Sequence, residues 1–325
     1  MKILHSARIT PSLCGLYETT RELVAAEVAL GHDAALVDPL DGKKSGEDRG
    51  APIKDMSFKA DVIVNHSGVN DAMKATGLPI VHVMHGRPRS SFLLEKTKKT
   101  KILSYLLAVR HDPQFKAFVT LWPKHKPFWD RFLAPHEVKV IPAPVDLVRW
   151  TPDGPKGYGF HGHKGAVNLV CADAWREDAD PFNVLCAAAV YASETVGVKV
   201  HLYGVDLAEQ DGVGALTQIL KDLDALGEVI GRVKGLANVY RAADVALCPH
   251  QIATRSMREP MACGCPVVSA NDADPEYLGA FAHAIRLAVQ GGKDLRPLAR
   301  ARAERDFDPA NSAKALLGVI EEALK

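Results

Sequence analysis

The chain has 325 residues, of which 47% are hydrophobic and 24% charged, and its formal net charge at pH 7 is +1. This length predicts two ordinary domains rather than one large core. No run of about 18 apolar residues occurs, and the start MKILHSARIT lacks a basic segment followed by an apolar one, so we expect neither a membrane-spanning helix nor a signal peptide. The expectation is a soluble, cytoplasmic protein.

The first half of the sequence alternates short apolar runs with segments of helix length. KILHSA reads as a strand, and GLYETTRELVAAEVALGH reads as a helix that stops at Gly31, a residue that commonly ends helices. Runs rich in Val, Ile and Leu predict further strands at AALVDP, DVIVNHS, PIVHVMH, AFVTLW and VKVIPAP. This alternation is typical of parallel strands joined by crossover helices.

A segment rich in Pro and Gly, residues 150–165, is the best candidate for a linker. After it, strands are predicted at NLVCADA, VKVHLYG, EVIGRV, DVALCPH and PVVSAN, and helices at PFNVLCAAAVYASE, ALTQILKDLDALG, LANVYRAAD and PANSAKALLGVIEEALK. We expect an α/β fold of two Rossmann-like, doubly wound domains facing a central cleft. Their bounds are 1–150 and 151–308, and a C-terminal helix at 309–325 could cross back to the first domain.

Seven motifs carry a resemblance to a known family. In chain order they are MKILH with Gly15 after it, ALGHDAALV, VMHG, VIPAPVDLVRWTP, LYG, NVYRAADVALCPH and REPMACGCPVVSA. Over nearly its whole length the chain resembles the GT-B glycosyltransferases, in particular the retaining family 4. The resemblance implies an acceptor-binding N-terminal domain and a donor-binding C-terminal domain. It also implies a nucleotide-diphosphate sugar, most simply a UDP-sugar, as co-substrate without another cofactor, and transfer that retains configuration and needs no metal.

The donor site is predicted around the sequence REPMACG. Pro260 is tolerated best in a first helical turn, so a helix should begin close to Glu259, where its amide groups and dipole suit a diphosphate. The resemblance implies that Glu259 holds the ribose hydroxyls, and a carboxylate suits a vicinal diol. The alternative is that Ser256 and Glu259 form an ordinary capping box.

Gln251 departs from the family pattern, which has Glu eight positions before the residue matched by Glu259. An amide accepts and donates hydrogen bonds but supplies no negative charge to an oxocarbenium-like transition state. Gln251 therefore remains a candidate for sugar binding, with its catalytic contribution in doubt. In the following loop, Arg255 and Ser256 are candidates for diphosphate contacts.

Arg176 matches the arginine with which the family neutralises the leaving diphosphate, but the lysine expected five residues later is Pro181. Leaving-group charge needs stabilisation, so this departure should matter. Arg232 and Lys234, in the same donor-binding segment 231–264, are further candidates for binding the donor. No metal site is predicted.

In the N-terminal half, two residues are candidates for the cleft. Gly15 would let the start of the first helix approach the phosphates. His85 follows a strand, and the resemblance implies that it touches the sugar; the alternative is a histidine that satisfies only local hydrogen bonds.

The acceptor site is predicted in residues 85–139, which carry 12 Lys and Arg against 4 Asp and Glu, interleaved with aromatic residues. Basic and aromatic residues together are typical of nucleic-acid binding. This favours a hydroxymethylated DNA base as acceptor. A lipopolysaccharide, lipid-linked or polysaccharide acceptor at an anionic membrane surface and a small molecule stay open. The candidate residues are Arg87, Arg89, Lys124, Lys126 and Trp129.

Two other classes stay open because the donor site departs from the family pattern. One is a degenerate GT-B protein that binds a nucleotide or nucleic acid without turnover, and the other is a sugar-nucleotide epimerase. The six cysteines lie mostly singly in apolar stretches, so we interpret them as buried thiols. The oligomeric state is not predicted.

Overall fold

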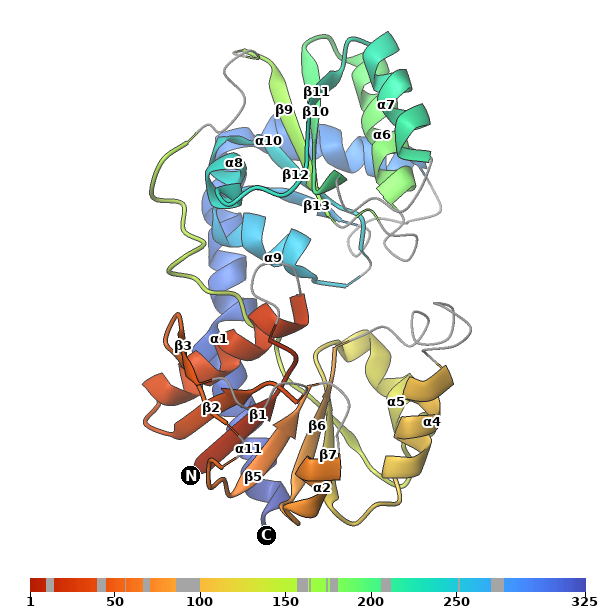
Figure 1. The fold of residues 1–325 in the computed structure, drawn as a ribbon. Coiled ribbons are helices and arrows are strands. Elements are labelled where there is room, and N and C mark those ends of the chain that lie inside the picture. Colours follow the sequence, from red (N-terminus) through yellow and green to blue (C-terminus); the bar gives the residue numbers. More distant parts are fainter. Residues whose placement is uncertain are drawn as a thin grey trace. The chain divides into compact units, whose positions relative to one another are not determined.

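The computed structural model describes residues 1–9, 15–39, 45–55, 57–66, 71–85, 100–156, 163, 165–173, 175, 181–205, 212–250, 252–269 and 278–325. The chain divides into two compact units. Unit 1 comprises Met1–Pro144 together with Phe307–Lys325, and unit 2 comprises Val145–Asp306. Both ends of the chain therefore belong to unit 1 (Figure 1).

Unit 1 is built on a sheet whose strands, within the described residues, follow the order β3-β4-β2-β1-β5-β6-β7-β8. Every neighbouring pair is parallel except the short hairpin of β3 and β4. The inner strands consist mainly of apolar residues, as is typical of parallel strands that are buried on both faces of the sheet. The strands are β1 (Lys2–Ser6), β2 (Asp33–Val37), β3 (Gly46–Asp48), β4 (Ala51–Ile53), β5 (Val62–Asn65), β6 (Ile80–Met84), β7 (Phe115–Thr120) and β8 (Val138–Val140).

The helices of unit 1 come from both ends of the chain. Helix α1 ends before Gly31, whose φ of 88° is the left-handed backbone that glycine adopts without strain. The last helix of the chain, α11, packs on α1 and contacts β7. The helices are α1 (Gly15–Ala29), α2 (Asp71–Ala75), α4 (Thr100–Val109), α5 (Lys126–Phe132) and α11 (Pro309–Ala323), with a 3₁₀ turn η1 (Pro123–His125).

Unit 2 is built on a parallel sheet of order β11-β10-β9-β12-β13. Helices α6 and α7 lie on one side of this sheet and α8 on the other (Figure 1). The strands are β9 (Val167–Ala172), β10 (Val198–Tyr203), β11 (Leu226–Ile230), β12 (Val245–Cys248) and β13 (Val267–Ser269). The helices are α6 (Pro181–Glu194), α7 (Gly212–Asp222), α8 (Leu236–Ala242), α9 (Arg255–Ala262) and α10 (Leu278–Phe307).

The strand order of each sheet reverses at one point. In unit 1 the chain moves from β1 outward through β2, and then restarts on the other side of β1 at β5; in unit 2 it moves from β9 through β10 to β11 and restarts at β12. Ligands of open α/β sheets bind beside the carboxyl ends of the strands at such a reversal. The mixed α/β architecture with parallel sheets confirms the fold class expected from the sequence. Among the described residues, none of the helices is apolar over a length that would span a bilayer.

The structure agrees with the interpretation of most cysteines as buried thiols. Cys171, Cys248, Cys263 and Cys265 are buried and free, whereas Cys186 is half-buried. Burial raises the pKa of the Cys248 thiol to about 11 and that of the Cys265 thiol to about 12. These thiols are therefore protonated, inert core residues at neutral pH.

Buried histidines make the stability of both units sensitive to acid. Burial lowers the pKa of His82, in β6, to about 4 and that of His201, in β10, to about 3. An unfolded histidine titrates near pH 6.5, so the unfolded state binds protons first and stability is lost as the pH falls below about 6.5. At pH 5 we expect each histidine to lower the free energy of unfolding by about 2 kcal/mol relative to pH 7. Urea unfolding at pH 7 and pH 5 measures this, and an equal free energy at both pH values would contradict it.

Candidate functional site

Helix α9 is the next element after the strand β12, which borders the reversal point of unit 2. The helix begins at Arg255, with Thr254 as N-cap in extended conformation. This corrects the prediction that the helix begins close to Glu259: Pro260 lies inside the helix, and Glu259 is its fifth residue. The first amide groups of a helix have no partner within it and carry its positive dipole end, so this end suits an anionic group.

Glu259 forms an ion pair with Arg255 one turn earlier. The distance from Arg255 Nε to Glu259 Oε1 is 2.5 Å, and the two side chains are 14% and 10% exposed. The pair thus places a guanidinium and a carboxylate together at the amino end of α9. A carboxylate has about four acceptor sites, so Glu259 can hold Arg255 and still accept hydrogen bonds from a diol.

The hydroxyl groups at the start of α9 tie the helix to β12. Ser256 Oγ lies 2.8 Å from Thr254 Oγ1 and 3.5 Å from the sulfur of Cys248, the last residue of β12. Ser256 lies inside the helix and Thr254 is the N-cap, so the alternative capping box beginning at Ser256 is wrong. The Ser256 hydroxyl thus ties the start of α9 to β12, and its contact with a diphosphate stays a prediction.

A second buried polar pair marks the reversal point of unit 2. His250 Nε2 lies 2.8 Å from Asp173 Oδ2, and the two side chains are 11% and 7% exposed. Asp173 follows β9 and His250 follows β12, which are neighbouring strands. The pair therefore anchors the loop that leads from β12 toward α9.

The other donor-site candidates lie either in another loop of unit 2 or outside the described residues. Arg232 and Lys234 are exposed in the loop between β11 and α8. Gln251 and Arg176 lie outside the described residues. The structure thus brings together Arg255, Ser256 and Glu259.

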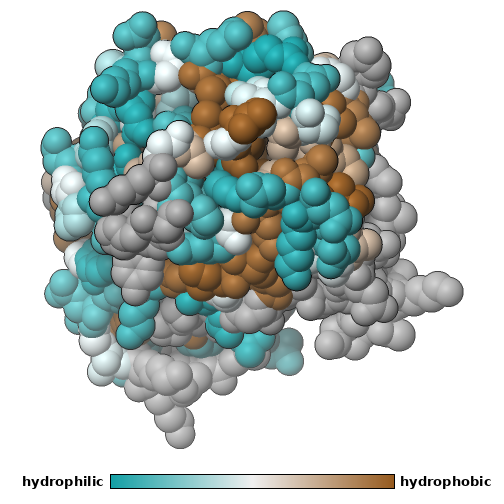
Figure 2. Space-filling view, turned by 90° about the horizontal axis from the view of Figure 1, so that it is seen from above, coloured by the Kyte–Doolittle hydropathy of each residue, from teal (hydrophilic) through white to brown (hydrophobic). Residues whose placement is uncertain are grey.

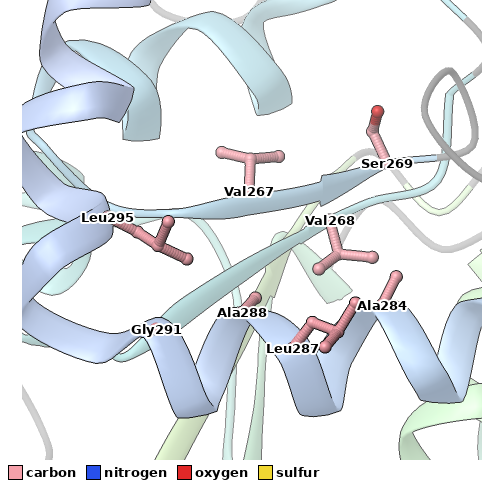
Figure 3. A pocket seen from close by; sticks show the side chains of 8 residues that line it. All are labelled: Val267, Val268, Ser269, Ala284, Leu287, Ala288, Gly291 and Leu295. Atoms are coloured by element: carbon pink, nitrogen blue, oxygen red, sulfur yellow. The ribbon is translucent and has the colours of Figure 1, made fainter.

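A cavity of about 310 Å³ lies elsewhere in unit 2, between β13 and α10 (Figure 3). Its lining is almost wholly apolar: Val267, Val268, Ser269, Ala284, Leu287, Ala288, Gly291 and Leu295. Figure 2 shows that hydrophobic and hydrophilic residues alternate on the face of the molecule seen from above. An apolar lining does not compensate the charge of a diphosphate, so this cavity is a poor candidate for the donor site.

In unit 1, the half-buried His85 ends a row of hydrogen bonds whose other side chains are buried. His85 Nε2 lies 2.7 Å from His66 Nδ1, His66 Nε2 lies 2.9 Å from His5 Nδ1, and His5 Nε2 lies 2.7 Å from Glu27 Oε2. His5 and Glu27 are fully buried, His66 is 3% exposed, and His85 is half-buried. The row starts on α1, crosses the reversal point between β1 and β5, and ends just after β6.

Two clusters of polar side chains have now been described, the pair of Asp173 and His250 and the row of Glu27, His5, His66 and His85, and neither surrounds a point where a metal ion could bind. In the row of unit 1 each ring nitrogen faces the next side chain. Across the described part of the chain, no group of three or more His, Cys, Asp or Glu side chains has the geometry to hold a metal ion. Gly15, the first residue of α1, is exposed.

The structure changes the interpretation of the acceptor candidates. Trp129 is 2% exposed and belongs to the core of unit 1, so its ring offers no face to a ligand, which corrects the expectation that it contacts an acceptor. Lys126 is paired with Asp130 at 2.8 Å and with Glu137 at 3.6 Å. Lys124 is exposed in η1, whereas Arg87 and Arg89 lie outside the described residues.

Solved structures of glycosyltransferases are similar to this chain over nearly its whole length. HepE of Anabaena, in complex with UDP and glucose, is 14% identical with a TM-score of 0.71 over 99% of this chain and 100% of that one. The chain has a GT-B fold. WaaG, a glycosyltransferase involved in lipopolysaccharide biosynthesis, is 15% identical with a TM-score of 0.67 over 98% and 99% of the two chains. An α-glucosyltransferase in complex with UDP and a 13-mer DNA containing an HMU base is 10% identical with a TM-score of 0.66 over 99% of each chain.

No family model matches the sequence, and no curated protein matches it. At these identities the likeness concerns the GT-B fold alone. The function therefore has to be argued from the side chains of this chain.

Sequence reasoning missed the two buried polar clusters of the GT-B units. His5 lies on β1, Glu27 on α1 and His66 just after β5, and Asp173 and His250 are 77 residues apart. One signal was available: His5 and Glu27 each interrupt an otherwise apolar face, in KILHS and in LVAAEVA. A polar residue on an apolar face needs a buried partner.

Proposed function

We propose that this protein is a glycosyltransferase that uses a nucleotide-diphosphate sugar, with a UDP-sugar as the first choice of donor. The observation that carries the proposal is the amino end of α9, where Arg255 and Glu259 form an ion pair beside the carboxyl end of β12. The similarity of the fold to structures in complex with UDP supports it.

Each group at this end has a role in the proposal. The first amide groups of α9 and the Arg255 guanidinium bind the diphosphate, and Glu259 accepts hydrogen bonds from the ribose hydroxyls. Arg176 neutralises the leaving diphosphate and Gln251 binds the sugar, with Arg232 and Lys234 as further contacts. Transfer then proceeds with retention of configuration and without a metal ion.

The acceptor is proposed to bind to the N-terminal domain, residues 1–150, while residues 151–308 bind the donor. The positive charge of residues 85–139 supports an anionic acceptor, whereas the aromatic residues Phe115, Phe118 and Trp129 of this segment are buried. A hydroxymethylated DNA base remains the first proposal, supported by the fold likeness to the α-glucosyltransferase in complex with DNA. A lipopolysaccharide acceptor is the second candidate, supported by the likeness to WaaG.

Sugar transfer is tested by incubating the protein with panels of UDP- and GDP-sugars and acceptors, followed by mass spectrometry. The acceptors include DNA with and without hydroxymethylated bases, and lipopolysaccharide. We expect the mass of one sugar to be added to one acceptor class. A DNA acceptor would be bound less tightly as salt rises, because phosphate contacts release counterions.

The contrary outcome separates turnover from binding. If UDP raises the thermal stability of the protein but no donor is consumed, the protein is a binding protein of GT-B fold without turnover. If UDP and GDP give no stabilisation and no donor is hydrolysed, the proposed function is wrong.

A further inference from the structure

The first residues of the segment that we expected to be a linker lie against unit 2. The Arg241 guanidinium on α8 donates from Nε to the backbone oxygen of Thr151 at 2.7 Å and from Nη1 to that of Pro155 at 3.3 Å. The Trp150 side chain is buried, with 4% of the residue exposed. Residues 145–155, the strap, therefore belong to the packed structure of unit 2.

A second arginine joins the strap to two helices. Arg300 lies on α10, and its Nη1 atom donates to the backbone oxygen of Ala262, the last residue of α9, at 2.8 Å. The same atom donates to the strap, at 2.8 Å to the backbone oxygen of Trp150 and at 3.3 Å to that of Leu147. Arg300 Nε donates to Glu304 Oε1 at 2.6 Å, which holds the side chain along α10. One guanidinium thus contacts the strap, α9 and α10.

The neighbouring contacts hold the strap and α10 together. Arg296, one turn earlier on α10, donates to the backbone oxygens of Arg241 and Ala243 at the end of α8. Gly264 follows α9 with a φ of 71°, and a Cβ atom there would lie 3.4 Å from Pro152 Cγ on the strap and 3.5 Å from the Arg296 backbone oxygen. The strap therefore packs closely on the chain that leaves α9, where glycine adopts the left-handed backbone without strain.

Arg300 acts on the carboxyl end of α9. The last carbonyl groups of a helix have no partner within it and carry the negative end of its dipole, so a guanidinium there stabilises the helix. At the other end, the Ser256 hydroxyl ties α9 to β12. The helix has eight residues and is about 12 Å long. A shift at Ala262 therefore tilts the amino end, where Arg255 and Glu259 form their ion pair.

We propose that Arg300 is a positioning residue for the donor: through Ala262 it sets the orientation of α9, and through Trp150 it couples α9 to the strap. This inference rests on the proposed binding of the donor at the amino end of α9 and adds to it a residue outside the binding site. Coupling between two sites is reciprocal, so a nucleotide that fixes α9 also stabilises the strap. Without Arg300, α9 adopts its binding orientation for a smaller fraction of the time, and the apparent affinity falls by that fraction.

The first test measures the Kd for UDP by isothermal titration calorimetry in Arg300→Met, Arg300→Lys and the control Arg305→Met. Methionine is a long side chain without a hydrogen-bond donor, so we expect the Kd to rise roughly 5- to 10-fold, as for moderately coupled sites. Lysine keeps the charge and donates from one nitrogen, so it should restore part of the affinity. The Arg305 side chain is 71% exposed and pairs with the adjacent Asp306, so the control should bind UDP like the unchanged protein.

A second test needs no ligand. Hydrogen exchange of the full-length protein reports on the strap through the Trp150 amide, which donates to the backbone oxygen of Asp146 at 2.9 Å. It reports on the end of α9 through the Gly264 amide, which donates to the backbone oxygen of Met261 at 2.9 Å. We expect both amides to exchange faster in Arg300→Met and at the unchanged rate in the control variant.

Exchange with saturating UDP tests the coupling itself. In the unchanged protein, UDP should slow exchange at Trp150, although by less than within α9, and Arg300→Met should lose this response of the strap. An arginine with a merely structural role would lower the melting temperature and leave the response in place. If Arg300→Met does not fold, Arg300→Gln, whose uncharged amide is two bonds shorter, takes its place with the same expectations.

The outcomes separate this inference from the proposed function. If the unchanged protein and Arg300→Met bind UDP equally tightly, or if the loss of Arg300 changes exchange in neither the strap nor the end of α9, the positioning role is refuted and the donor site on α9 stands. If the unchanged protein does not bind UDP, the donor site is wrong and the positioning role with it.

Discussion

Glu259→Ala is expected to raise the Kd for UDP by roughly 10- to 100-fold. A hydrogen bond to a charged group contributes about 1.5–3 kcal/mol, and 1.4 kcal/mol is a factor of ten in affinity. Glu259 is held by Arg255 at 2.5 Å, so its carboxylate is already oriented at the amino end of α9. Isothermal titration calorimetry with UDP measures the change.

Because Glu259 is paired with Arg255, the effect of Glu259→Ala has to be separated from the effect of the lost ion pair by matched variants. Removing Glu259 also removes one partner of the Arg255 guanidinium, which we propose binds the diphosphate, so Glu259→Gln, Arg255→Ala and the double variant complete a mutant cycle. Arg302→Ala is the control, because Arg302 forms an i,i+4 pair with Asp306 on α10 at 3.6 Å. Unchanged UDP affinity in Glu259→Ala and in the double variant would remove the donor site from α9.

Trp129→Ala is expected to destabilise the protein by about 3–5 kcal/mol, the usual cost of truncating a buried tryptophan. The Trp129 ring is 2% exposed and packs edge-on against Phe128 and Phe132, with ring centroids 5.0 and 6.0 Å apart. Urea unfolding measures the loss.

The control for Trp129 is the exposed Lys124, since surface substitutions usually change stability by less than about 0.5 kcal/mol. Lys124→Ala should therefore unfold like the unchanged protein. Trp129→Ala should also bind UDP normally, because the donor is proposed to bind to unit 2. Unchanged stability together with weaker acceptor binding would show that Trp129 is a ligand contact after all.

The fold class could be predicted because its evidence is local. The strands around Leu4, Val64 and Leu247 are short apolar runs buried on both faces, and the sequence pattern of such runs does not depend on their partners. The β3 and β4 hairpin was missed because each strand has three residues, too few for any periodicity. The start of α9 was misplaced because Pro260 was assigned to a first turn, although it is tolerated here inside the helix.

The candidate sites were predicted only in part because their partners are distant in sequence. The pair of Arg255 and Glu259 is spaced for one helical turn and is visible in the sequence once the helix start is known. His5 and His66 are 61 residues apart and meet because β1 and β5 are neighbours at the reversal point. That adjacency follows from the order of the sheet and from no local pattern.

We propose that a nucleotide diphosphate binds at the amino end of α9. Hydrogen exchange of the full-length protein with and without saturating UDP tests it most directly. We predict slower exchange in residues 252–263, with residues 231–235 as the next most affected segment. Unchanged exchange there, with protection in unit 1 alone or around the apolar cavity of β13 and α10, would contradict the account.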